Sequence, residues 1–567
     1  MYILGLSFGY HDSSASLISD KKIIASSLEE RFSRIKHDKN FPYLSIKFCL
    51  ECENIDINDI EKVIFYEDTV LKFDRILETI EDKELLSSLI DQYMPLLDIQ
   101  SYIANKLNID KNKIFTANHH LSHISSHLIS NYEESVILSI DGVGEYETLT
   151  IYQSKDNNLT KLFTKELPHS VGLLYSAFTA FLGFEVNEGE YKVMGLASYG
   201  NPIYKDKIYE LLEIEDDDFF IKDGFFNFNS VDTLYTKKFL DKFGNEKVGS
   251  DYDLEQDKYY VDVASSIQSV TEDLVLMYIN KATKLSGSKN VCLCGGVALN
   301  SVANEKVKQQ YKDINLFVPP DPGDGGSSLF CALYYAKYIK KVPTQYKLES
   351  PFLGKRYSIE ELKKDIYESF TGEYIQIDDK DKFFDYVSDL LIKDNVIGWF
   401  YGEFEWGPRA LGHRSIIANP MNKEMKDIIN SKIKFREAFR PFAPSILNDY
   451  AKEYFKIGTV GYNEIESYML GVSDVFPDKI DKIPAVVHED NTGRVQVVFK
   501  ENNEMYYRLI ESFYKKTGVP VILNTSYNLK GEPVVSSLKD ALLTFSYSYM
   551  DYLVAYPFIL SSFGVKK

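Results

Sequence analysis

The alternation of apolar and polar residues predicts two copies of one strand–turn–strand unit. The first copy occupies residues 2–25 and the second occupies residues 135–152. Each begins with an apolar run, at 2–7 and at 135–140, followed by a polar turn that contains glycine and a further apolar run. Short apolar runs bounded by such turns are typical of β-strands. A repeat of this kind within one chain indicates two related halves.

The rest of the pattern predicts a mixture of helices and strands. Further strands are expected at residues 291–294, 316–318, 396–400 and 519–523, and helices at 82–94, 327–339 and 359–370. The polar segment 340–345 is the best candidate for a linker between domains. We therefore predict two α/β domains, at residues 1–345 and 346–567.

Composition narrows the class of protein. The chain has 567 residues and a formal net charge of −20, which argues against a protein that wraps nucleic acid or lies on an anionic membrane. Its 5 cysteines are too few for a disulfide framework, and the chain opens without a signal-peptide pattern. We expect a cytoplasmic protein. The Cys49–Cys52 pair has no second pair to complete a zinc site, so we interpret it as structural.

A group of histidines predicts a metal site. If the segment around them is helical, His119, His123 and His127 share one face, because side chains four residues apart project together. A solvated polar helix face is the alternative. Asp141 and Asp324 favour the metal, because each follows an apolar stretch, where a free carboxylate is costly unless a cation or hydrogen bonds accept it.

Glycine-rich turns follow three of the predicted strands. They contain Gly142 and Gly144, Gly295 and Gly296, and a third group at 323–326. Such turns let backbone N–H groups approach a phosphate. A single one is often only a turn, but three beside Asp or Asn residues favour a nucleoside triphosphate site. None of them is a Walker or Rossmann fingerprint.

Basic residues concentrate in the C-terminal half of an otherwise acidic chain. They are Arg409, Arg414, Lys432, Lys434, Arg436, Arg440 and Arg494. Arg409 and Arg440 stand beside proline and apolar residues, which indicates fixed, partly buried guanidinium groups that need an anion. Surface salt bridges are the alternative. Asn524 and Ser526 end an apolar strand and could supply neutral donors to the same anion.

Taken together, these motifs resemble one known family along essentially the whole chain. The sequence is similar to the ATP-dependent O-carbamoyltransferases of the nodulation-factor and antibiotic-tailoring type. The motifs that carry the resemblance are His11–Ala15, Glu29–Asp38, His119–His123, Asp141–Glu145, Glu188–Ala197, Cys294–Asn300, Gly323–Gly326, Gly407–Ser415, Arg440–Ser445 and Asn524–Ser526. His127 and His413 depart from the family's usual residues at their positions.

The resemblance implies the fold and the reaction. The N-terminal domain would have the actin-like fold of the tRNA threonylcarbamoyl transferase, and the C-terminal domain would be similar to the tRNA threonylcarbamoyl-adenylate synthase. In this family, carbamoyl phosphate is hydrolysed and the carbamate is adenylated by ATP in the C-terminal domain. The carbamoyl-adenylate is then attacked by a substrate hydroxyl in the N-terminal domain.

The resemblance also assigns residues to each task. It implies catalytic roles for His11, Asp12 and Lys36, with His11 as the general base. The implied metal ligands are His119, His123, Asp141 and Asp324, and iron is the family's usual metal. The nucleotide site would be formed by Gly142, Gly144, Lys192, Gly295, Gly296 and Asn300. Carbamoyl phosphate would be held by Arg409, Lys434, Arg440, Arg494, Asn524 and Ser526, with Arg436 as a rival to Arg440.

The expected ligands are ATP with Mg, iron, carbamoyl phosphate and a hydroxyl-bearing small-molecule or glycan acceptor. No motif identifies the acceptor, and the oligomeric state is left open. Two alternatives come from other classes. A sugar-kinase-like phosphotransferase would use the same core, and a nucleotide-gated binding module would use it without catalysis.

Overall fold

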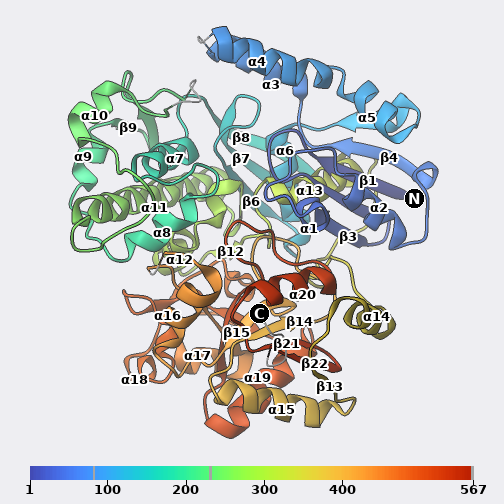
Figure 1. The fold of residues 1–567 in the computed structure, drawn as a ribbon. Helices are drawn as coiled ribbons and strands as arrows, with labels where there is room; N and C mark the ends of the chain where they lie inside the picture. The colour runs from blue at the N-terminus through green and yellow to red at the C-terminus, as the bar shows by residue number, and fades with distance from the viewer. Residues whose placement is uncertain (81–82, 229–232, 438, 563–567) are drawn as a thin grey trace. The chain divides into compact units, whose positions relative to one another are not determined.

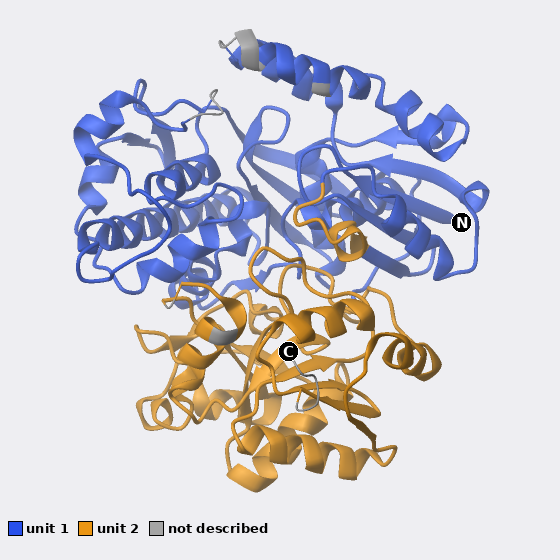
Figure 2. Ribbon diagram, in the orientation of Figure 1, with its two compact units in different colours: residues 1–26, 39–348 blue, residues 27–38, 349–567 orange. Residues whose placement is uncertain are grey.

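The computed structural model describes residues 1–80, 83–228, 233–437 and 439–562 and separates the chain into two units (Figure 1; Figure 2). Unit 1 comprises Met1–Ser26 and Lys39–Leu348, and unit 2 comprises Ser27–Asp38 and Glu349–Lys567. No helix in the described ranges combines the length and the apolar character that a bilayer crossing needs.

Unit 1 contains two five-stranded sheets with the same strand order. The first has the order β3-β2-β1-β4-β5, with β1 at Tyr2–Ser7, β2 at Ser14–Ser19, β3 at Ile23–Leu28, β4 at Ile60–Phe65 and β5 at Ile114–Thr116. The second has the order β8-β7-β6-β11-β12, with β6 at Ser135–Ile140, β7 at Glu147–Lys155, β8 at Asn158–Glu166, β11 at Asn290–Cys294 and β12 at Asn315–Phe317.

The two sheets repeat each other in strand direction as well. In both, the first strand pairs antiparallel with the strand that follows it and parallel with a strand reached through helices. The outermost pairs, β4–β5 and β11–β12, are also parallel. The predicted repeat is confirmed, and the duplicated arrangement is that of an actin-like α/β unit.

Helices cover these sheets and connect their strands. The principal helices of unit 1 are α2 (Tyr43–Glu51), α3 (Thr69–Thr79), α4 (Lys83–Tyr93), α5 (Ile99–Leu107), α6 (His119–Ile124), α7 (Val171–Phe181), α8 (Glu190–Ala197), α11 (Lys258–Ser286), α12 (Ser301–Gln310) and α13 (Ser327–Tyr334). The predicted helix 82–94 corresponds to α4, and its first residue lies outside the described part of the chain. The predicted helix 327–339 begins as α13 and ends as a π-helical turn at Tyr335–Ile339.

Small residues allow α13 to pack tightly on the first sheet. The backbone of Gly5 in β1 lies so close to α13 that a Cβ there would stand 1.7 Å from the Ser328 carbonyl oxygen. The Ser328 hydroxyl hydrogen-bonds with Ser14 and Ser16 at 2.8 and 2.7 Å. This contact positions the turn before α13, which carries Asp324.

Unit 2 is built on one mixed sheet of eight strands in the order β13-β22-β21-β14-β15-β20-β16-β19. Their bounds are β13 Tyr374–Gln376, β14 Ile397–Phe400, β15 Arg414–Ala418, β16 Ala443–Leu447, β19 Gln496–Val498, β20 Val521–Ser526, β21 Tyr552–Ala555 and β22 Phe558–Ser561. The main helices are α14 (Ile359–Ser369), α15 (Lys380–Ile392), α19 (Glu504–Thr517) and α20 (Leu538–Tyr547), and Figure 1 shows α20 on one side of the sheet and α15 with α19 on the other.

The α/β class of the C-terminal part is confirmed by this sheet. Its likeness to the tRNA threonylcarbamoyl-adenylate synthase stays a prediction. The predicted division between residues 345 and 346 needs two corrections. The chain divides after Leu348, and residues 27–38 belong to unit 2.

Arginine side chains explain why this early segment belongs with the C-terminal half. Arg31 donates to the carbonyl oxygen of Gly407 at 3.2 Å. Arg34 donates to the carbonyl oxygens of Val534 and Pro533 at 2.7 and 2.9 Å. Hydrogen bonds from charged donors are among the stronger contacts in proteins. No signal in the apolar pattern marks such contacts, since the partners are backbone carbonyls more than 370 residues away in the chain.

We predict that Gly5→Ala destabilises the protein by about 3 kcal/mol, the upper end for an overpacked core, because the new methyl group collides with helix backbone. Gly458→Ala is the control, since a Cβ at Gly458 meets nothing within 4 Å and that glycine is exposed. Thermal or urea unfolding measures both. Equal unfolding midpoints for Gly5→Ala and the natural protein would contradict this packing.

Candidate functional site

Four predicted metal ligands converge at one edge of the two sheets of unit 1. His119 and His123 lie one turn apart on α6. Asp141 directly follows β6, and Asp324 begins the short 3-10 turn that leads into α13. One ligand atom from each of the four lies within 4.8 Å of the others. The strand end, the helix face and the turn therefore deliver their side chains to a common point.

The distances between the ligand atoms fit a metal ion. His123 Nε2 lies 3.0 Å from His119 Nε2 and 3.2 Å from Asp324 Oδ1. Asp141 Oδ2 lies 2.9 Å from His119 Nε2 and 3.5 Å from His123 Nε2. Ligands at ~2.1 Å from a common ion stand ~3.0–3.4 Å apart in octahedral or tetrahedral geometry. The group thus matches the spacing and the N/O chemistry of a transition-metal site.

Charge within the cluster also calls for a cation. Burial works against an ionised Asp141, but hydrogen bonds with His119 and His123 hold its pKa well below the ordinary value. Burial likewise disfavours protonated His119, yet Asp324 and Asp141 raise its pKa well above the ordinary value. The two carboxylates, whose side chains are 14% and 10% exposed, therefore require positive charge beside them, which protons or a metal ion can supply.

The predicted third histidine of the face does not join this group. The α-helix gives way to a 3-10 turn at Ser125–Ile129, which rotates His127 out of register. Its ring hydrogen-bonds with the Ile124 carbonyl at 2.8 Å and with the Tyr338 hydroxyl at 2.9 Å. Burial lowers its pKa to about 4. His127 is thus a neutral structural residue.

His11 and Asp12 lie beside the four candidate metal ligands. His11 Nδ1 is 2.9 Å from Asp12 Oδ2, and its Nε2 is 3.6 Å from Asp324 Oδ2. Burial alone would lower the pKa of His11, but the hydrogen bond with Asp12 and the charge of Asp324 raise it to about 9. Asp12 itself has a φ of 51°, a left-handed conformation uncommon outside glycine. Lys36 belongs to unit 2, where its Nζ lies 3.6 Å from Glu30 Oε2.

Asp141 joins the metal cluster to the predicted nucleotide turns. Its second carboxylate oxygen, Oδ1, accepts a hydrogen bond from the Gly296 N–H at 3.0 Å. Gly295 has a φ of +85°, and a Cβ there would lie 2.4 Å from the Ile140 carbonyl oxygen. The turns at 141–144 and 295–296 are therefore neighbours, because β6 and β11 run parallel and end at the same edge.

Two other predicted nucleotide residues have different environments. Asn300 caps α12 by accepting from Ala303 N at 3.1 Å, and its amide nitrogen donates to Gln268 Oε1 at 3.0 Å. Its side chain is thus committed to the fold. Lys192 lies half-buried on α8, with its ammonium 5.8 Å from the ring centre of Phe184.

Unit 2 gathers the predicted phosphate-binding cations. Burial and the charges of Arg409, Arg436 and Arg440 together hold the pKa of Arg494 well below its ordinary value. Arg494 Nε is buried and has no hydrogen-bond partner among the described residues. A guanidinium in this position favours an anionic ligand, since both burial and like charges raise its free energy.

Lys434 shares this electrostatic environment. Burial, then Arg436 and Arg440, lower its pKa well below the ordinary value. Its ammonium donates to the Asn528 carbonyl at 2.9 Å, to Asn528 Oδ1 at 2.8 Å and to Ser526 Oγ at 3.3 Å. All of these acceptors are neutral oxygens. The positive charge is stabilised locally but not cancelled.

Asn524 uses its amide nitrogen within the fold, and its role toward carbamoyl phosphate stays a prediction. Its amide nitrogen lies within hydrogen-bond distance of the Ala410 carbonyl, Ser445 Oγ and Gln496 Oε1, at 3.0–3.1 Å. The two hydrogens that it can donate are therefore directed at protein groups, and Asn524 braces β20 against its neighbours. Ser526, two residues further along β20, lies beside Lys434.

Several residues in and beside the motif at 407–415 hold its loop in place, which the charge pattern alone did not indicate. Glu405 is buried and accepts backbone hydrogen bonds from Leu411, His413 and Arg414 at 2.8–3.1 Å. Arg414 is fully buried and donates to several carbonyl oxygens, including that of Tyr401 at 2.7 Å. The ring of His413 stacks on Phe352 with 3.6 Å between ring centres. These contacts shape the loop that presents Arg409.

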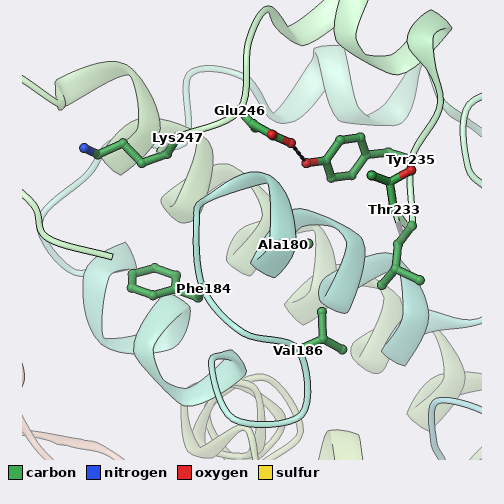
Figure 3. Close-up of a pocket in the computed structure, with 8 residues that line it drawn as sticks. Ala180, Phe184, Val186, Thr233, Tyr235, Glu246 and Lys247 are labelled. Atoms are coloured by element: carbon green, nitrogen blue, oxygen red, sulfur yellow. Dashed lines mark hydrogen bonds between the residues drawn. The ribbon is translucent and has the colours of Figure 1, made fainter. Parts of the chain in front are cut away.

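A separate cavity of about 290 Å³ lies in unit 1 (Figure 3). Its lining residues are Ala180, Phe184, Val186, Thr233, Leu234, Tyr235, Glu246 and Lys247. None of the predicted site residues lines it. The hydroxyl of Tyr235 hydrogen-bonds with Glu246 across its wall.

Comparison with known proteins assigns the chain to a family. Residues 2–333 match the family described as carbamoyltransferase N-terminus, and residues 388–562 match the carbamoyltransferase C-terminus. The chain belongs to the carbamoyltransferase family. The first match contains the four candidate metal ligands and the glycine turns of this carbamoyltransferase. The second contains its cation group, which consists of Arg409, Lys434, Arg440 and Arg494.

Relatives extend over nearly the whole carbamoyltransferase chain. An uncharacterized protein of Synechocystis is 38% identical, covering 99% of this chain and 96% of its own length. The nodulation protein NolNO of Sinorhizobium fredii is 32% identical, covering 97% of this chain and 79% of its own. The nodulation protein NolO of Bradyrhizobium diazoefficiens is also 32% identical, covering 78% of each chain.

Two buried glutamates near the metal cluster were missed by sequence reasoning. Glu145 accepts backbone hydrogen bonds from His119 and Asp68, both at 2.8 Å, and so fixes the start of α6. The only signal was its place at the end of the Asp141–Glu145 motif. Glu67 lies just after β4, with Oε2 3.9 Å from His119 Nδ1, and nothing in the sequence distinguished it from a surface carboxylate.

We predict that His123→Ala weakens binding of a divalent transition metal by more than roughly 100-fold, because a direct ligand should matter more than the outer partners whose loss costs 10–100-fold. Titration of the purified protein with Co²⁺ or Zn²⁺ measures the affinity. His127→Asn is the control and should bind metal as the natural protein does. Loss of binding in His127→Asn alone would refute this ligand assignment.

Proposed function

We propose that this carbamoyltransferase is an ATP-dependent O-carbamoyltransferase. It would take the carbamoyl group from carbamoyl phosphate, pass through carbamoyl-adenylate and transfer the group to a hydroxyl of a small molecule or glycan. The observation that supports the donor is the group of buried Lys434 with the half-buried Arg409, Arg440 and Arg494, in which burial and neighbouring like charges lower the pKa of Lys434 and Arg494. A phosphate dianion has the size and charge to pair with these cations.

The donor chemistry is assigned to unit 2. Water would break the acyl–phosphate bond of carbamoyl phosphate, giving carbamate and phosphate. A carbamate oxygen would then attack the α-phosphorus of ATP, forming carbamoyl-adenylate and expelling pyrophosphate, with Mg accompanying the nucleotide. Arg409, Arg440 and Arg494 would hold the phosphate and offset the charge that develops on it.

The transfer step is assigned to unit 1. His119, His123, Asp141 and Asp324 would hold the metal, for which we propose iron, and the bound metal would polarise the carbamoyl carbonyl as a Lewis acid. The glycine turns beside Asp141 would receive the adenylate. His11 lies 3.6 Å from Asp324, one of the carboxylates that raise its pKa to about 9; with a cation bound at Asp324, the neutral ring would be favoured and would take the proton of the acceptor hydroxyl. The hydroxyl oxygen would form the new C–O bond, and AMP would leave.

Family membership favours this function over the alternatives. A sugar-kinase-like phosphotransferase leaves the cation group of unit 2 and the histidine pair unexplained. A binding module would not require His11 for turnover. A cytoplasmic location is also proposed, and it is supported by five cysteines that are all free in the structure.

We predict that release of pyrophosphate from ATP requires carbamoyl phosphate and that AMP accumulates when an acceptor is carbamoylated. A coupled pyrophosphate assay and nucleotide chromatography measure both products. His11→Ala should keep ATP binding and lose transfer, which separates an enzyme from a binding module. ADP as the only nucleotide product, or pyrophosphate release that ignores carbamoyl phosphate, would contradict the proposal.

We predict that Arg494→Met raises the melting temperature of the ligand-free protein and abolishes its stabilisation by inorganic phosphate. Removing a buried charge with a depressed pKa removes its cost in the native state. At 100 times its Kd, phosphate should stabilise the natural protein by about 2.7 kcal/mol. Arg508→Met is the control, since Arg508 pairs with Asp381 and Glu504 at the surface. An unchanged phosphate response in Arg494→Met would count against the anion site.

A further inference from the structure

A buried ion pair stands directly behind the metal ligand His119. Glu67 and Lys72 are 3% and 6% exposed, and both carboxylate oxygens accept from the ammonium, at 2.9 and 2.8 Å. Glu67 follows β4 and Lys72 lies on α3, so the pair joins two elements. Oε2 of Glu67 lies 3.9 Å from Nδ1 of His119.

The chemistry of the ring explains what this carboxylate can do. His119 Nε2 faces the other three ligands, so Nε2 must be unprotonated when it binds a metal. The ring proton then resides on Nδ1, which is buried and has no hydrogen-bond partner among the described residues. A buried donor without an acceptor costs about 1–3 kcal/mol. Glu67 Oε2 lies 3.9 Å from Nδ1, so a small shift of the ring would bring that proton within hydrogen-bond distance of the carboxylate.

Lys72 keeps the carboxylate charged in this position. An isolated carboxylate this deeply buried would be costly, and burial alone would raise the pKa of Glu67. The charges of Lys72 and His119, with the hydrogen bonds from Lys72, instead lower that pKa. The ammonium in turn lies over the rings of Tyr10 and Tyr93, at 5.3 and 5.7 Å from their centres. The whole arrangement is enclosed and pre-formed.

We propose that the Glu67–Lys72 pair orients His119 and strengthens metal binding, with Glu67 accepting the Nδ1 proton. The pair is a positioning element, since it does not touch the metal's coordination atoms. The inference rests on the proposed metal site. His123 supplies an internal contrast, because the only carboxylates within 4.0 Å of its ring nitrogens, among the described residues, are those of Asp141 and Asp324, and both face Nε2.

The competing explanation is that the pair only ties α3 to the end of β4. Single variants cannot separate the two, because Glu67→Gln leaves the Lys72 charge buried and alone, which can cost about 3–5 kcal/mol. The double variant Glu67→Gln with Lys72→Met removes both charges together. Replacing a whole buried pair is often close to neutral for stability.

The experiment measures metal affinity and the absorption spectrum of bound Co²⁺ in the natural protein, in Glu67→Gln and in the double variant. The melting temperature of each metal-free protein monitors folding. We expect a loss of 10–100-fold in Co²⁺ affinity in both variants, with a shifted Co²⁺ spectrum, even where the double variant regains the natural melting temperature.

The matched control is a second buried pair of unit 1. Lys165 lies 2.9 Å from Asp218 and over the rings of Phe219 and Phe220, much as Lys72 lies over two tyrosines. Lys165→Met with Asp218→Asn should keep the natural Co²⁺ affinity.

Two results would overturn the inference. If the double variant has the melting temperature, Co²⁺ affinity and Co²⁺ spectrum of the natural protein, the pair is only structural. Failure of the natural protein to bind Co²⁺, Zn²⁺ or Fe²⁺ would refute the metal site itself, and this inference with it.

Discussion

The Asp141 carboxylate is the contact on which the organisation of unit 1 depends. One oxygen faces His119 at 2.9 Å, and the other accepts from Gly296 N at 3.0 Å. Its backbone is held by the start of α7, where the Ser170 hydroxyl donates to the Asp141 carbonyl at 3.1 Å. Gly172 allows that approach, since a Cβ there would lie 2.7 Å from the same oxygen. The residue at the end of β6 therefore contacts both the candidate metal ligands and the glycine turns.

The two units meet the cost of buried charge in opposite ways. Unit 1 collects carboxylates, so that histidine protonation or a cation must balance Asp141 and Asp324. Unit 2 collects guanidinium and ammonium groups, and their mutual repulsion adds to the cost of burial at Lys434 and Arg494. The cations of unit 2 are costly without an anion, whereas in unit 1 protonated His119 and His123 stabilise the carboxylates even without a metal ion. The chain, with its acidic net charge, therefore contains one local group of carboxylates in unit 1 and one local group of cations in unit 2.

The features that could be predicted from the sequence are those that depend on local interactions. The first strands of both sheets, Tyr2–Ser7 and Ser135–Ile140, have the predicted bounds because an apolar run between turns reflects burial directly. The four-ligand group was predictable through residue type and spacing. His127 was misplaced because a helix that tightens into a 3-10 turn leaves no mark in the spacing of histidines. Glu67 and the attachment of residues 27–38 to unit 2 depend on distant partners, which a single sequence does not display.

A destabilised ligand-free site has a thermodynamic consequence for the whole chain. A ligand that binds only the native state stabilises it in proportion to the logarithm of its concentration over Kd. The charges of Lys434 and Arg494 lower native stability when no anion is bound, so part of the free energy of anion binding offsets this cost. Arg414, whose guanidinium donates to backbone carbonyls, and Glu405, whose Oε1 accepts from three backbone N–H groups, supply rigidity without that dependence. Support is thereby separated from the proposed anion site: Arg414 and Glu405 hold the loop that presents Arg409.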